Sequence, residues 1–121
     1  MDFKKQYTFE ERLGESARII GKFPDRVPVI CEQPTGSSRL PLIGKKKFLV
    51  PVDITVSQLV CIIRKRVTIA PEMGIFLFVN SRTKGSHIPP NSLSIFEIYK
   101  HHRDLDNFLY ISISSENTFG F

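Results

Sequence analysis

Apolar residues recur along this chain with two periods, and these separate helical from extended segments. Between positions 8 and 22 the period is helical, with the apolar stripe Phe9, Leu13, Ala17 and Ile20. Thr8 and Glu11 stand three residues apart at its start, which is the pattern of a capping box. Gly21 and Pro24 are typical of a helix end. The pattern therefore predicts a helix over residues 8–22.

The next two segments have the period of strands. Residues 26–32 place apolar side chains on both faces, with Val27, Val29 and Cys31 on one and Pro28 and Ile30 on the other. A strand with two apolar faces needs cover on both, and the helix over 8–22 is the obvious cover for one. Residues 47–51 form a second strand, and Pro51 at its end favours an edge position because proline donates no ladder hydrogen bond.

The rest of the pattern completes an α+β fold. A second helix, beginning at 55 or 57 and reaching 67, carries the stripe Val56, Leu59, Val60, Ile63 and Val67. The other predicted elements are a helical turn over 2–6, a loop over 33–44, a strand over 74–79, a long polar loop over 80–91, a short helix over 94–101 and a last strand over 108–114. This order predicts a ubiquitin-like β-grasp, with a four-stranded mixed sheet and two extra N-terminal helices. Within one folded domain we expect a helical extension over 1–24, the β-grasp core over 25–115 and a flexible tail over 116–121.

The composition fits one globular domain, and the net charge indicates which kinds of partner the protein could bind. The 121 residues are 41% hydrophobic and 24% charged, with a net charge of +5 and a pI of about 9.4. The positive charge suggests acidic peptides, anionic membrane or nucleic acid as partners. We expect neither a signal peptide nor a membrane-spanning run. Cys31 and Cys61 stand in apolar surroundings and are predicted to be buried thiols of an intracellular protein.

Three segments carry a family resemblance. FPDRVPVI at 23–30, KKKFLVP at 45–51 and DNFLY at 106–110 occur in the order and spacing of the autophagy-related ubiquitin-like modifiers. That family includes microtubule-associated protein light chain three and the GABA-receptor-associated protein, and the likeness runs from residue 3 to 120. The segment 80–90 is several residues longer here than the matching turn of typical members, and we expect it to bulge at the surface.

The resemblance implies a modifier that other enzymes attach to lipid. A dedicated cysteine protease would remove Phe121, and E1-like, E2-like and E3-like enzymes would join Gly120 to phosphatidylethanolamine on autophagosomal membranes. A glycine suits this role because it lacks a Cβ and passes a narrow channel. The protein would then be cytoplasmic until lipidated, and a substrate of enzymes rather than an enzyme itself.

The resemblance also implies a groove that binds aromatic-x-x-aliphatic peptides of cargo receptors and adaptors by adding a strand. Residues i and i+3 of a strand point to opposite faces, so one pocket is expected on each side of the second strand. Pocket one comprises Glu15, Ile19, Pro28, Ile30, Lys47, Leu49 and Phe108. Pocket two comprises Phe48, Val50, Pro51, Ile54, Leu59, Ile62 and Ile63. The alternative for any single member is ordinary core, and Ile63 fits that alternative best.

Basic residues flank this groove and would attract acidic residues of the peptide. They are Arg26, Lys45, Arg64 and Arg66, and the alternative is a solvated basic face. A second function stays open, an unconjugated ubiquitin-like module that uses its basic face for tubulin, anionic lipid or nucleic acid. We expect no nucleic acid partner, because the aromatic residues fit the groove better than a stacking platform.

No cofactor, metal or catalytic centre is expected. His101 and His102 are adjacent, so their side chains diverge, and His87 stands alone in the predicted loop. No nucleophile motif surrounds either cysteine. A monomer is the default expectation.

Overall fold

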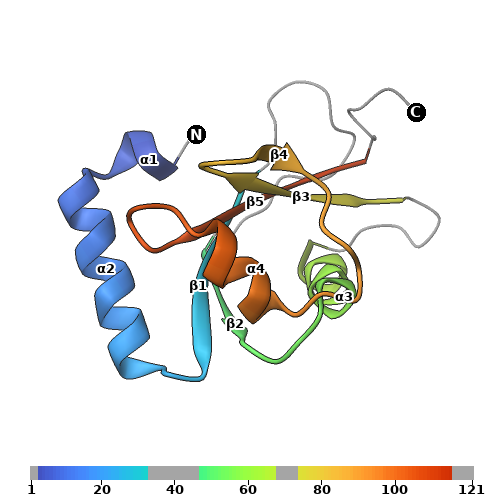
Figure 1. The fold of residues 1–121 in the computed structure, drawn as a ribbon, viewed down its shortest axis with the longest axis horizontal. Coiled ribbons are helices and arrows are strands. Elements are labelled where there is room, and N and C mark those ends of the chain that lie inside the picture. Colours follow the sequence, from blue (N-terminus) through green and yellow to red (C-terminus); the bar gives the residue numbers. More distant parts are fainter. Residues whose placement is uncertain (1–2, 33–46, 68–73, 116–121) are drawn as a thin grey trace.

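A computed structural model describes residues 3–32, 47–67 and 74–115 of the chain (Figure 1). The predicted loop over 33–44 lies outside these residues, as does the tail over 116–121. The elements are α1 (Phe3–Gln6), α2 (Phe9–Lys22), β1 (Arg26–Glu32), β2 (Lys47–Pro51), α3 (Val56–Val67), β3 (Phe76–Ser81), β4 (Gly85–His87), α4 (Ile95–His102) and β5 (Leu109–Ser114). Two predicted strands, β1 and β2, begin and end where the sequence placed them, and most other ends differ by one or two residues.

One mixed sheet holds all the described strands, in the order β2-β1-β5-β3-β4. β1 pairs antiparallel with β2 and parallel with β5, so Val29 faces Phe48 on one side and Leu109 on the other. β3 pairs antiparallel with β5 and with β4. The expected edge position of β2 and the expected mixed sheet are confirmed.

The predicted count of four strands is wrong, because a fifth strand lies in the segment expected to be a loop over 80–91. β4 forms a hairpin with β3, in which Ser81 pairs with Gly85. Gly85 has a φ of 74°, a conformation that glycine adopts without steric cost. β4 spans only Gly85–His87 and has no apolar alternation, so its sequence gives no strand pattern.

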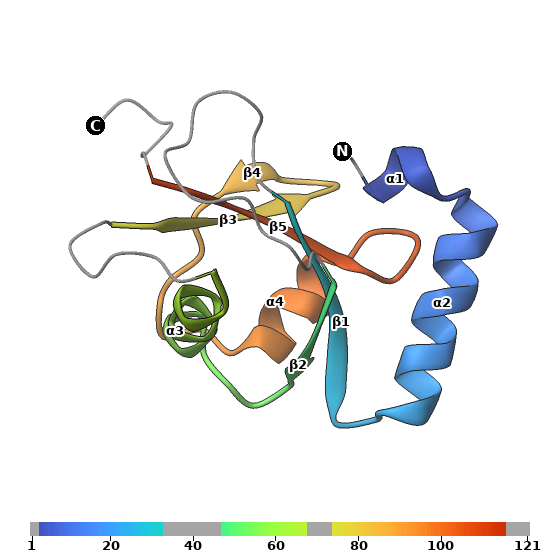
Figure 2. The same cartoon turned by 180° about the vertical axis from the view of Figure 1, so that it is seen from behind.

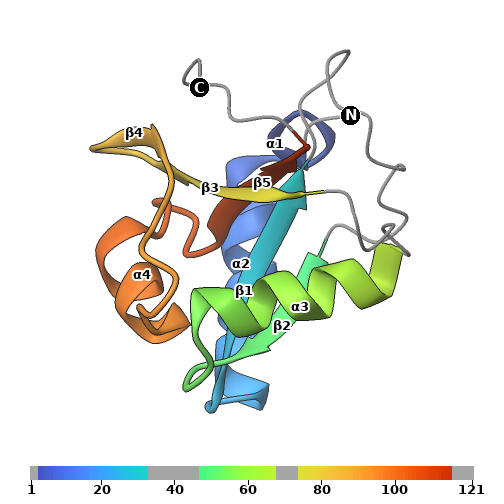
Figure 3. The ribbon, with the colours of Figure 1, turned by 90° about the vertical axis from the view of Figure 1, so that its right-hand side faces the viewer.

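The sheet has a helical layer on each face. In Figure 3, α2 lies behind the strands, while α3 and α4 lie in front, and Figure 2 shows the same layers from behind the view of Figure 1. The larger core cluster fills the α3–α4 side and includes Val27, Val29 and Cys31. The smaller cluster, on the α2 side, joins Ile19, Ile30, Phe108 and Tyr110. Both faces of β1 are therefore covered, as its sequence predicts.

The start of α2 agrees with the sequence, but its buried face does not. Thr8 caps the helix and exchanges both capping-box hydrogen bonds with Glu11, as predicted. The predicted apolar stripe is wrong as the packing face, because Phe9 and Ile20 are exposed by 41% and 38%. The helix instead buries Ser16 and Ile19. Polar contacts between α2 and the loop before β5 decide which face of the helix is buried. The spacing of apolar residues along the helix does not reveal such contacts.

In the part of the chain that the structure describes, no helix combines the length and apolar character that crossing a bilayer requires.

Candidate functional site: the β2 edge and its pockets

β2 is the edge strand of the described sheet, and its side chains alternate between the two faces. Phe48 and Val50 belong to the larger core cluster beside α3, while Leu49 packs against the smaller cluster beside α2. In the described residues β2 pairs with β1 alone. Its other edge therefore presents backbone groups between two helix-covered faces, which is the arrangement that accepts an added strand.

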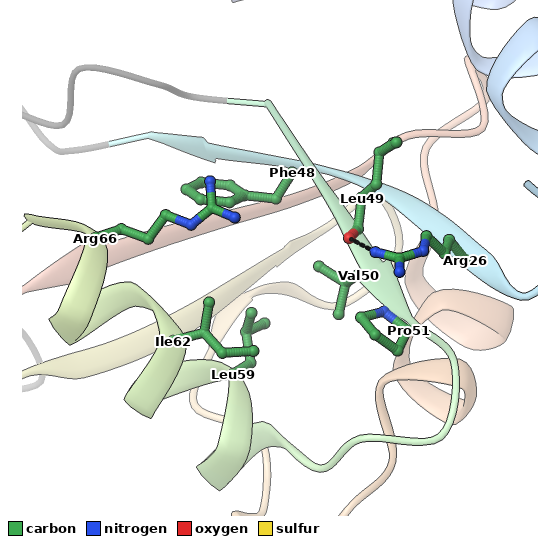
Figure 4. A pocket seen from close by; sticks show the side chains of 8 residues that line it. All are labelled: Arg26, Phe48, Leu49, Val50, Pro51, Leu59, Ile62 and Arg66. Atoms are coloured by element: carbon green, nitrogen blue, oxygen red, sulfur yellow. Dashed lines mark hydrogen bonds between the residues drawn. The ribbon is translucent and has the colours of Figure 1, made fainter.

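A pocket of about 380 Å³ opens between β2 and α3, at the predicted pocket two (Figure 4). Its lining residues are Arg26, Phe48, Leu49, Val50, Pro51, Leu59, Ile62 and Arg66. Five of the seven residues predicted for pocket two are among them. Ile63 is wholly buried in the core below, and Ile54 is half-buried in the turn after β2, where its carbonyl accepts the Ile95 N–H at 2.8 Å.

Two arginines lie at this pocket. The Arg26 guanidinium donates from Nη1 to the Leu49 carbonyl at 3.3 Å, and the Arg66 guanidinium lies 5.6 Å from the centre of the Phe48 ring. Arg64, predicted to flank the groove, is half-buried on α3 and is not among the residues lining this pocket. Lys45, predicted with it, lies outside the described residues. Arg26 and Arg66 are thus the described cations that a ligand in pocket two would meet.

Pocket one differs more from its prediction. Ile19, Ile30 and Phe108 are fully buried in the smaller core cluster, and Pro28 is buried on β1. The Lys47 ammonium lies 2.6 Å from a Glu15 carboxylate oxygen, which links β2 to α2.

An open space of about 310 Å³ adjoins this ion pair on the side of α1. It is lined by Phe3, Tyr7, Glu11, Arg12, Glu15 and Lys47. The first four residues were not predicted as site residues. Their clearest sequence feature is the pair of aromatic residues four positions apart, and the two rings lie 5.1 Å apart.

Glu15 is held ionised by its neighbours. Hydrogen bonds from Arg18 and from Lys47 lower the Glu15 pKa from 4.5 to about 2, against a smaller opposing effect of burial. Arg18 donates to both carboxylate oxygens, at 2.9 and 3.1 Å. The Glu15 carboxylate therefore stays ionised until the pH falls toward about 2.

This link predicts a pH dependence of stability. A lowered folded-state pKa adds stability above the unfolded value near 4.5 and loses it as pH falls toward about 2. We expect the melting temperature of Glu15→Gln to depend less on pH between about pH 4.5 and about 2 than that of the unchanged protein. The difference should be small, because the ion pair is partly exposed. Circular dichroism melts of both proteins check this. An equally steep pH profile in Glu15→Gln would contradict the assignment.

A buried polar network, absent from the sequence prediction, fixes α2 above pocket one. The Asp106 side chain is fully buried and accepts from Arg12 Nη1 at 3.0 Å, from the Tyr110 hydroxyl and from the Phe108 N–H. Ser16 donates to the Asp106 carbonyl at 2.6 Å. Burial and then the Asp106 hydrogen bond raise the Tyr110 pKa, so the phenol stays protonated and donating.

The two cysteines lie in different surroundings, one buried in the sheet and one exposed on α3. Burial raises the Cys31 pKa to about 12, so it remains a thiol. Cys61 is exposed on α3, and its predicted burial is wrong because its position faces away from the α3 stripe. Among the described residues, no three His, Cys, Asp or Glu side chains come together in an arrangement able to hold a metal ion.

A five-stranded β-grasp sheet with helices on both faces is the architecture of a ubiquitin-like protein. The family described as "Autophagy protein Atg8 ubiquitin like" matches residues 11–120. Autophagy-related protein 8 of Kluyveromyces marxianus is 51% identical over 118 residues, covering 98% of this chain and 90% of that protein. The Candida glabrata protein of the same name is 47% identical over 119 residues, covering 98% and 96%.

A solved structure agrees with these sequence matches. Plasmodium falciparum Atg8, in complex with a P. falciparum Atg3 peptide, has a TM-score of 0.84 and 32% identity, covering 97% of this chain and 98% of that one. The chain belongs to the Atg8 family of autophagy-related ubiquitin-like proteins.

Proposed function

We propose that this protein is a non-enzymatic ubiquitin-like modifier of autophagy that recruits partners through the β2 edge. The observation that carries this proposal is the edge strand itself, whose side chains alternate between pocket two and the α2 side. A peptide strand added to this edge would place its residues i and i+3 on opposite faces. An aromatic side chain at the pocket-one end and an aliphatic one in pocket two satisfy this geometry.

The two pockets differ in whether a peptide side chain could enter them without a rearrangement. Pocket two is open and apolar at its floor, with Phe48 and Val50 nearly buried. The apolar residues predicted for pocket one are buried in the smaller cluster, and Lys47 and Glu15 of the same set form an ion pair, so we infer that an aromatic anchor would have to displace that pair. Each anchor contributes about 1.5–3 kcal/mol, and ordering costs offset part of this, so we expect roughly micromolar affinity.

Peptide binding tests this proposal through α3. We expect Ile62→Ser to weaken an aromatic-x-x-aliphatic peptide about tenfold, because it removes apolar wall from pocket two. Lys65→Ser is the matched control, since Lys65 is exposed on the same helix and does not line the pocket. Isothermal titration calorimetry with one peptide and both variants gives the comparison. Equal loss in the two variants would place the aliphatic anchor elsewhere.

The proposal includes conjugation through the tail. The family match ends at residue 120, which is Gly120, and the P. falciparum relative was solved with a peptide of Atg3. We infer that a cysteine protease removes Phe121, and that E1-like, E2-like and E3-like enzymes transfer the Gly120 carbonyl to the amine of phosphatidylethanolamine. Both residues lie outside the described part of the chain. The two acyl chains of such a lipid would hold the protein stably on autophagosomal membranes.

Intact-mass measurement tests conjugation separately from peptide binding. Incubated with an autophagy-competent extract and phosphatidylethanolamine vesicles, the chain should lose the mass of Phe121 and then gain that of the lipid. Gly120→Ala is expected to stay unlipidated while binding the peptide normally. Lipid attachment to Gly120→Ala would refute this role of Gly120 and leave the groove proposal intact.

A further inference from the structure

The tip of the β3–β4 hairpin and the end of α4 bring basic and titratable side chains together, away from the β2 groove. The His87 and His102 rings lie 4.9 Å apart, and the His101 ring lies 6.4 Å from His102. We call Lys84, His87, His101 and His102 the histidine cluster. The prediction that His87 stands alone in a loop is wrong, because pairing of β4 with β3 carries it to α4.

Hydrogen bonding fixes the orientation of this cluster. Ser81 Oγ accepts the backbone N–H of Thr83 at 3.3 Å and of Lys84 at 3.2 Å. Thr83 Oγ1 lies 3.4 Å from this oxygen and His102 Nδ1 lies closer, at 3.0 Å, so we assign the Ser81 hydroxyl proton to His102 Nδ1. A neutral His102 that accepts at Nδ1 carries its hydrogen on Nε2. His102 therefore keeps one N–H donor that this contact with the hairpin does not use.

His87 is oriented in the opposite sense. Its Nδ1 lies 3.2 Å from the Gly85 carbonyl, so Nδ1 carries the hydrogen of the neutral ring and donates there. Protonation therefore adds a hydrogen at Nε2. Each of the two rings thus has an Nε2 that can donate, His102 when neutral and His87 when charged.

The cluster has more positive charge than its neighbours balance. Burial lowers the His102 pKa, and so do His87 and Lys84 from the hairpin and His101 from its own helix. Glu97 pairs with Lys100 at 3.4 Å and with His101 at 3.5 Å. Among the described residues, no carboxylate lies within ion-pair distance of Lys84, His87 or His102.

We propose that Lys84, His87 and His102 form a binding site for a phosphate group. A phosphorylated serine or threonine offers three acceptor oxygens and a charge near −2, and these match an ammonium and two ring N–H donors. Because a protonated imidazole ring binds an anion more strongly than a neutral ring, affinity should rise as the pH falls through the range in which histidine side chains ordinarily titrate. This site is independent of the proposed peptide groove and of conjugation.

The position of the cluster favours a phosphorylated partner over a lipid surface. β3 runs from Phe76, opposite Ser114 at the end of β5, to Ser81 at the hairpin tip. The tip and the end of β5 therefore lie toward opposite ends of the sheet (Figure 1). Lipid attachment beyond the end of β5 therefore does not require this cluster to contact the bilayer.

Histidine ring signals in nuclear magnetic resonance test the site directly. We expect an acetyl-Gly-phosphoserine-Gly-amide peptide to shift His87 and His102 saturably, and the unphosphorylated peptide to leave them unchanged. Lys84→Ala and His87→Ala should each weaken binding about tenfold. Lys100→Ala is the matched control, because it also removes one lysine charge, and Lys100 stands near His102 on α4 but outside the cluster. It should change affinity less than about twofold.

Sulfate serves as the pH probe, because its charge stays constant over the range in which histidine titrates. Its affinity should increase from about pH 8 to about pH 6, and this increase should shrink in His87→Ala. No saturable shift, or equal losses in Lys84→Ala and Lys100→Ala, would overturn the proposal. Lys84-dependent shifts with phosphatidylserine vesicles but none with the phosphopeptide would also overturn it, since the ligand would then be a membrane.

Discussion

Asp106→Ala is expected to lower the free energy of unfolding by about 3–5 kcal/mol, the usual cost of breaking a buried ion pair by removing one partner. The Arg12 side chain is only 11% exposed and would lose its carboxylate. The Phe108 N–H and the Tyr110 hydroxyl would lose their acceptor in the same place. Each buried donor without a partner costs about 1–3 kcal/mol.

Urea unfolding followed by circular dichroism measures this loss. Asp53→Ala is the matched control, because Asp53 is an exposed carboxylate in the turn after β2, and it should change stability by less than about 0.5 kcal/mol. If Asp106→Ala does not fold, Asp106→Asn replaces it, because the amide keeps an oxygen that can accept the Phe108 N–H. Its loss of unfolding free energy should lie between that of Asp53→Ala and the loss expected for Asp106→Ala. A loss no larger than that of Asp53→Ala would show that the Asp106 network does not stabilise the packing of α2 on the sheet.

The same network has a consequence for the groove. Arg12 and Ser16 attach α2 to the loop before β5, and Glu15 on the same helix reaches Lys47 of β2. The Asp106 network therefore positions the ion pair above pocket one without contacting a peptide. We expect Asp106→Asn, where it folds, to alter binding of the aromatic anchor more than of the aliphatic one.

Much of the fold could be predicted from the sequence because short-range patterns decide it. The two apolar faces of β1 require two layers of cover, and Pro51 favours the edge position of β2. The Thr8–Glu11 capping box sets the start of α2 through contacts three residues apart. The pocket two set followed from the family resemblance, and five of its seven members line one pocket.

The rest depends on contacts between residues far apart in the chain. Arg12 and Asp106 are 94 residues apart, and their pairing holds α2 in an orientation that leaves Phe9 and Ile20 exposed. β4 has no strand pattern of its own, and it exists because β3 and Gly85 form the hairpin. Whether His87 meets His102 depends on that hairpin, so the histidine cluster could not be read from residue spacing.

Leu59→Ala is expected to change both stability and peptide preference, because Leu59 serves the core and pocket two together. It is 1% exposed, belongs to the larger core cluster and lines the pocket. Truncation of a buried leucine costs about 2–5 kcal/mol. It also deepens the pocket, so a peptide with phenylalanine at the aliphatic position should gain about tenfold relative to one with leucine.

Ile63→Ala separates the two effects. Ile63 is fully buried one turn further along α3 in the same cluster, but it does not line the pocket. It should lose similar stability, about 2–5 kcal/mol, and leave the phenylalanine-to-leucine affinity ratio within about twofold. Calorimetric titration of both peptides into both variants measures that ratio. Because the two variants share the helix, the cluster and the chemistry of truncation, a ratio that moved equally in both would reflect general loosening of the core. It would then argue that the aliphatic anchor does not enter pocket two.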